Sequence, residues 1–156
     1  MSPQRIVVKT IHLPPSDPSL PALALQVTQL VDSYLVWIGA TGVSSDDIDQ
    51  APQQGNLSRD WACAMPPRLR GSYSSDAVPA TSLYRSSSSE VALPMAQRLA
   101  KRFRKQIFLS VDVPPAILSM SQSHKLLFAV EKGIVGALKD IEGDGRGDGS
   151  ASASTG

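Results

Sequence analysis

The sequence predicts an α+β domain, with a mostly antiparallel sheet of about six strands and two helices packed on one face. The clearest observation is a change of hydrophobic period within residues 93–113. Apolar residues recur every three or four positions up to Phe103 and every second position from Ile107, which indicates a helix that leads almost directly into a strand. The strand-like segments before it are joined without helices. This favours antiparallel pairing, because parallel neighbours need long crossover connections.

The first expected strands form a hairpin near the N-terminus. Residues 6–13 alternate in polarity and predict a first strand. Prolines between residues 14 and 21 exclude regular structure there. Residues 23–28 alternate again, which predicts a strand with one face in water. After turn residues at 32–33, the segment 34–38 is apolar on both faces, as in a central strand, and a glycine ends it.

The middle of the chain is less regular. Residues 42–59 are polar with little periodicity and predict an inserted flexible loop that folding does not require. Residues 61–65 alternate large residues with alanines, which indicates a short strand whose alanine face packs closely against a neighbour. Residues 79–84 predict a short edge strand.

The first helix is expected from about Pro94, since proline is tolerated in a first turn. Ser87 stands three residues before Glu90 in capping-box spacing, but a helix begun that early would enclose the proline. The face opposite its apolar stripe is basic, with Arg98, Lys101 and Arg102 on the helix and further cations after it. One side of this helix must therefore be buried, and the other faces water or an acidic partner.

The second helix is expected after a cap at Ser121 or Ser123. Its apolar stripe is wider than one sheet needs, which indicates burial against the sheet on one side and another subunit on the other. Gly133 and Gly136 weaken the helix but permit close approach of a neighbouring backbone.

Composition indicates a single folded domain over residues 1–141 and a disordered Gly/Ser-rich tail over 142–156. With 42% apolar residues, a chain of 156 residues can build one core. No apolar run approaches the length of a membrane span, and the N-terminus does not resemble a signal peptide. We therefore expect a cytoplasmic or nuclear protein that does not bind membranes.

Residues capable of catalysis are few. His12 and His124 are the only histidines, and Cys63 is the only cysteine. A nucleophile and base would arise only if the fold brought them together, so surface or capping histidines and a core cysteine are the favoured interpretation. The sequence has no glycine-rich phosphate loop and no metal-ligand spacing. We expect no enzymatic activity, no cofactor and no metal.

Two surfaces remain as candidates for partner binding: the basic face of the first helix and the wide stripe of the second. The candidate residues are Arg98, Lys101, Arg102, Leu127, Phe128, Ile134 and Leu138. The net charge is only +1, so an electrostatic partner would have to recognise a local patch. The basic face lacks interleaved aromatic residues, which argues against nucleic acid. A solvated face or an acidic protein partner is favoured, and a generic protein- or RNA-binding module is the alternative.

Several blocks of this sequence resemble the proteasome assembly chaperone 4 family in order and approximate spacing, from about residue 22 to residue 141. The blocks are residues 32–41, 61–65, 79–83, 95–101 and 105–110. The most specific parts are two short runs: Trp-Ile-Gly-Ala-Thr at the end of the first block and Ala-Gln-Arg-Leu-Ala in the fourth. The long 42–59 and 66–78 segments and the tail depart from compact members and fit a fungal-type member.

The resemblance implies a non-enzymatic chaperone subunit. It would form a heterodimer with assembly chaperone 3, bind an α-type proteasome subunit and promote assembly of the α-ring of the core particle. It also implies a six-stranded antiparallel sheet with packed helices. The resemblance does not assign binding roles to individual residues of this chain, because the family has no catalytic motif to match.

Overall fold

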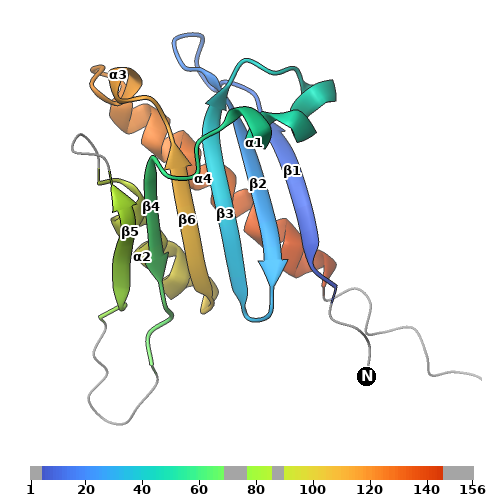
Figure 1. Ribbon diagram of the computed structural model, residues 1–156, viewed down its shortest axis with the longest axis vertical. Coiled ribbons are helices and arrows are strands. Elements are labelled where there is room, and N and C mark those ends of the chain that lie inside the picture. Colours follow the sequence, from blue (N-terminus) through green and yellow to red (C-terminus); the bar gives the residue numbers. More distant parts are fainter. Residues whose placement is uncertain (1–4, 69–76, 86–89, 146–156) are drawn as a thin grey trace, which may run out of the picture.

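The computed structural model describes residues 5–68, 77–85 and 90–145. One sheet carries the helices α2 and α4 on its back, while α1 lies at the top of its front face (Figure 1). The elements in chain order are β1 (Val7–Leu13), β2 (Ala22–Leu30), β3 (Ser33–Thr41), the 3-10 helix η1 (Ser45–Gln50), α1 (Ala51–Gln54), β4 (Asp60–Ala64), β5 (Ala80–Arg85), α2 (Ala92–Phe103), β6 (Gln106–Asp112), α3 (Pro115–Leu118) and α4 (Ser123–Asp144).

The sheet has six strands in the order β1-β2-β3-β6-β4-β5. Every neighbouring pair is antiparallel except β3 and β6, which run parallel. The predicted fold class is therefore confirmed. All six predicted strands are present, although β3 continues past Gly39 to Thr41. β2 and β3 are joined by a two-residue turn in which Asp32 has a φ of 50°, a left-handed conformation that aspartate tolerates better than most residues.

The core lies between the sheet and the two long helices. Alternate residues of the central strands point into it and are fully buried, as the period-two pattern predicts. Ala62 and Ala64 of β4 are also fully buried, which lets α2 approach the sheet closely. The largest buried side chains are Leu25, Tyr34, Ile38, Met95, Leu99, Ile107, Leu109, Leu126, Ile134 and Leu138.

The start of α2 differs from the sequence-based expectation. The helix begins at Ala92, two residues before Pro94, and its N-cap Val91 has no side chain able to cap it. The backbone N–H groups of Val91 and Ala92 donate instead to the Asp60 carboxylate, at 2.7 and 3.1 Å. A buried carboxylate from β4 thus caps the helix and faces the positive end of its dipole. Ser87, the cap considered from the sequence, lies outside the described residues.

The end of α4 is fastened to the sheet by a three-residue network. Lys105 Nζ donates to the Tyr34 hydroxyl at 3.1 Å, and that hydroxyl donates to Glu142 at 3.3 Å. Burial raises the pKa of Tyr34. Burial alone would lower the pKa of Lys105, but the hydrogen bond to Tyr34 and the charge of Glu142 raise it overall. The helix continues to Asp144, so the predicted domain end at 141 is too early. The rest of the predicted tail, residues 146–156, lies outside the described residues.

The prediction of an irregular insert at 42–59 is wrong for residues 45–54, which form the helical turns η1 and α1. Ala51 packs with Trp37 and Ala24 in a second, smaller apolar cluster on the front of the sheet. A Cβ at Gly55 would collide with the Trp37 ring, so only glycine allows the chain to pass so close. Periodicity missed these turns because they are too short to repeat. The short helix α3 was missed for the same reason.

Candidate partner-binding surfaces

The predicted apolar stripe of α4 divides into two parts in the structure. Ile134 and Leu138 are fully buried against the sheet, so they belong to the core and offer no surface to a partner. Leu127 is half-buried. Phe128 is 71% exposed and is the one predicted stripe residue whose side chain is mostly in solvent. A wide stripe on this helix therefore mostly reflects burial in its own domain.

The predicted basic face of α2 is partly neutralised. Arg98 makes two hydrogen bonds of 2.8 Å to the Glu131 carboxylate of α4 and so links the two helices. The carboxylate hydrogen bond raises the pKa of Arg98 above its ordinary value. Lys101 and Arg102 lie in the last turn of α2 and are exposed. The exposed Arg102 is therefore a candidate for contact with an acidic partner.

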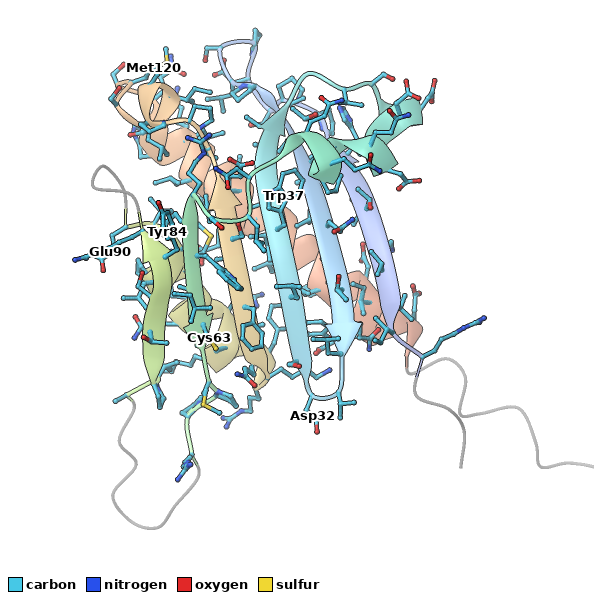
Figure 2. The ribbon with its side chains drawn as sticks, in the orientation of Figure 1. Asp32, Trp37, Cys63, Tyr84, Glu90 and Met120 are labelled. Carbon is cyan, nitrogen blue, oxygen red and sulfur yellow. The ribbon has the colours of Figure 1, made fainter. Side chains whose placement is uncertain are left out.

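The front of the sheet, away from α2 and α4, carries an apolar row that sequence analysis did not single out as a site. The strand register places Leu35 of β3 beside Phe108 of β6, and Phe108 beside Cys63 of β4. All three are half-buried on the face without a long helix. Figure 2 shows Cys63, Tyr84 and Trp37 from three strands on this same face. We call the row Leu35, Phe108 and Cys63, together with Trp61 and Tyr84 beside it, the open sheet face.

The upper part of the front is covered by the chain itself. Asp112, at the end of β6, accepts hydrogen bonds from the backbone N–H of Asn56 at 2.5 Å and from Arg59 Nε at 2.7 Å. Ser110 Oγ donates to the carbonyl of Leu57 at 2.7 Å. Residues 56–59 are thereby held over β6, and they shelter the polar side chains that would otherwise interrupt the sheet surface. The open sheet face begins where this cover ends.

The sequence did contain a signal for the open sheet face. Phe108 was expected opposite the core-facing residues of β6, and Trp61 and Cys63 were expected opposite the alanines of β4. Large apolar residues on the outward face of two strands indicate that both faces are covered. The strand order brings these outward residues together, and that order is not readable from periodicity.

The residues considered for catalysis lie on three different elements of the fold. Within residues 5–68, 77–85 and 90–145, no cluster of three His, Cys, Asp or Glu side chains is placed to hold a metal ion. His12, Cys63 and His124 lie on β1, β4 and α4, and the Cys63 sulfur accepts a hydrogen bond from Gln106 at 3.3 Å. None of the described helices is long and apolar enough to cross a membrane.

Comparison with known proteins identifies the family. A family model described as proteasome assembly chaperone 4 matches residues 22–113, which is more than half of the chain. The chain belongs to the proteasome assembly chaperone 4 family. The matched region runs from β2 through β6 and includes every residue of the open sheet face and all of α2. Membership supports a role as a proteasome assembly chaperone, and the family is one of chaperones and not of enzymes.

A solved structure shows the same fold. A chain of a chaperone complex for yeast 20S proteasome assembly aligns with a TM-score of 0.55 at 16% sequence identity. The alignment covers 87% of this chain and 95% of the yeast chain. A sequence comparison with curated proteins gives no significant match.

The hydrogen bonds of Asp112 predict that residues 55–59 are held tightly over the sheet. Replacing Asp112 by Ala removes an ionised acceptor from two donors, a loss of about 1.5–3 kcal/mol. We expect the Asn56 amide to exchange its hydrogen at least about tenfold faster, as measured by hydrogen–deuterium exchange. Asp49→Ala, which changes an exposed carboxylate of η1, is the control and should leave this exchange unchanged. Equal exchange in the Asp112→Ala variant and the unaltered protein would mean that other contacts hold the segment.

Proposed function

We propose that this chain is one subunit of a heterodimeric chaperone, that it pairs with proteasome assembly chaperone 3, and that the pair binds an α-type subunit to promote α-ring assembly. The observation that carries the proposal is the open sheet face. A sheet with half-buried Leu35 and Phe108 on its outer side lacks the cover that such side chains normally have. Family membership is the reason for proposing an assembly chaperone as the partner. The yeast chain of the same fold comes from a chaperone complex, which supports an assembly of more than one chain.

The open sheet face suits a partner of similar architecture. Its centre is the row formed by Leu35, Phe108 and Cys63, which is apolar, includes an aromatic ring and carries no charge. Depletion of charge and enrichment of aromatic residues characterise the centre of protein interfaces. A second sheet laid against this one would bury the row and complete a two-sheet layer between outer helices.

The exposed cation at the end of α2 suits a different task. Arg102 lies in the last turn of α2, and α2 packs on the face opposite the open sheet face. A heterodimer formed through the front of the sheet therefore leaves Arg102 exposed. We assign it to encounter with an acidic surface of the α-type subunit, where fixed charge speeds association more than it adds affinity. A generic protein- or RNA-binding module acting through the basic face of this helix is the second candidate. We place either activity in the cytoplasm or nucleus.

The proposal predicts that Phe108 is essential for the heterodimer. Phe108→Lys places a charge at the centre of the open sheet face, and we expect co-purification with assembly chaperone 3 to weaken by roughly 30-fold, the effect of losing a hot-spot residue worth about 2 kcal/mol. The melting temperature of the isolated variant tests whether the chain still folds, since Phe108 lies outside the helix-covered core.

Phe128→Lys is the matched control, because it changes an exposed phenylalanine on α4. It should leave the heterodimer intact. If Phe128→Lys abolished pairing and Phe108→Lys did not, the heterodimer would form through α4, and the role of the open sheet face would be refuted.

The charge assignment predicts an effect of Arg102 on association rate. Arg102→Glu should slow binding of the heterodimer to an α-type subunit at about 0.01 M ionic strength and have little effect near 1 M, where charges are screened within about 3 Å. Stopped-flow or surface-based kinetics measure the rate, and Lys139→Glu on α4 is the control. An unchanged rate at low salt would make Arg102 an ordinary solvated residue. Salt-sensitive binding of RNA, lost in Arg102→Glu, would favour the second candidate.

A further inference from the structure

The outward flank of α4 is an exposed surface on the side of the sheet opposite the open sheet face. Figure 1 shows α4 crossing the back of the sheet toward the lower end of β1. A groove of about 920 Å³ lies between this flank, β1 and the connection from β1 to β2. A Cβ built at Gly136, in the middle of the flank, would meet no atom within 4 Å. A neighbouring chain can therefore approach the backbone of α4 closely at this point.

Two opposite charges stand on either side of Gly136. Lys132 precedes it by four residues and Asp140 follows it by four, so all three lie in one row along the helix surface. Both charged side chains are exposed and line the groove. Neither has an opposite charge three or four positions away in α4, and within the described part of the chain neither takes part in an ion pair. At 1.5 Å per residue they are about 12 Å apart along the helix axis, too far to pair with each other.

The other charges that line the groove balance each other. Lys125 and Asp17 lie 4.0 Å apart, and Asp17 also accepts hydrogen bonds from Ser19. Lys132 and Asp140 are left without a partner among the described residues, and their charges are equal and opposite. A purely acidic ligand would be repelled by Asp140, and a purely basic one by Lys132. The groove therefore favours a ligand that carries both charges, in the reverse order and at the same spacing.

A second copy of α4 meets this description. When two copies of the helix cross in antiparallel directions at Gly136, a two-fold axis brings Lys132 of each copy to the level of Asp140 of the other. Two intermolecular ion pairs result. A parallel crossing would place Lys132 beside Lys132 and Asp140 beside Asp140, and like charges in contact are costly. The order of the charges along α4 therefore selects the antiparallel arrangement.

The residues beside this row suit such a crossing. Rows of residues spaced by four pack between the corresponding rows of a second helix at an angle of about −50°. The next row toward the groove consists of Ala129, Gly133 and Ala137, whose side chains are all small. They leave a shallow channel beside the row that contains Gly136, and the matching row of a second copy can lie in it. The shape of the flank thus agrees with its charges.

We propose that the outward flank of α4 binds a second copy of this chain, through an antiparallel crossing at Gly136 that pairs Lys132 of each copy with Asp140 of the other. The contact lies on the back of the sheet, so it leaves the open sheet face accessible and does not depend on the heterodimer. Where the heterodimer also forms, this contact joins two of them through α4.

Charge reversal in the full chain tests the proposal. Lys132→Glu leaves two carboxylates at each proposed contact, and Asp140→Lys leaves two ammonium groups there. We expect each variant to self-associate at least about tenfold more weakly than the unaltered chain. Sedimentation equilibrium at about 0.01 M ionic strength, where charges are little screened, measures the association. An equimolar mixture of the two variants restores both ion pairs and should associate as strongly as the unaltered chain.

Lys139→Glu is the matched control, because Lys139 is exposed on the same helix but does not line the groove. It should self-associate as the unaltered chain does. Circular dichroism checks that the variants fold, as expected for changes at exposed positions. Three results would overturn the proposal. They are a chain that stays monomeric at roughly 1 mM, equal self-association of all variants, which places the contact on another surface, and a mixture that fails to pair, which excludes the antiparallel crossing.

Discussion

Burial of the central strands on both faces is the constraint on which the rest of this structure depends. β3 and β6 direct Tyr34, Ile38 and Leu109 into the helix-covered core and also carry Leu35, Trp37 and Phe108 on the front. The long helices cover only the back. The front is covered in its upper part by residues 45–59, through the packing of Ala51 on Trp37 and the hydrogen bonds of Asp112. The lower part is the open sheet face, which no helix of the described chain covers.

The two faces of the sheet have different chemistry and suit different contacts. The open sheet face has the apolar row of Leu35, Phe108 and Cys63 at its centre, which fits the core of a protein interface. The end of α2, on the other face, exposes Arg102, and Arg98 pairs with Glu131 of α4.

Much of the fold follows from the sequence, because period and turn chemistry are local. The strands, the helix-to-strand switch at Lys105 and the long C-terminal helix were all predicted. The alanine face of β4 packs against a neighbouring element as expected, and the structure shows that this neighbour is α2. The misses concern long-range contacts. Asp60 caps α2 from a distant strand, Glu131 pairs with Arg98 across two helices, and the strand order gathers Leu35, Phe108 and Cys63. Of the predicted partner residues, Ile134 and Leu138 proved to be core residues, because a periodic stripe shows that a face is buried but not what buries it.

The reactivity of Cys63 tests the central claim most directly, because this single cysteine lies half-buried on the open sheet face. Its alkylation rate would be measured in the isolated chain and in the heterodimer with assembly chaperone 3. A cysteine placed at exposed position 139, by Lys139→Cys in a Cys63→Ser background, reports general changes in reactivity. If the heterodimer forms through this face, alkylation of Cys63 slows by at least about tenfold on pairing and that of position 139 does not, since a buried thiol is not accessible to the reagent. An unchanged rate at Cys63 in a fully formed heterodimer would contradict the account.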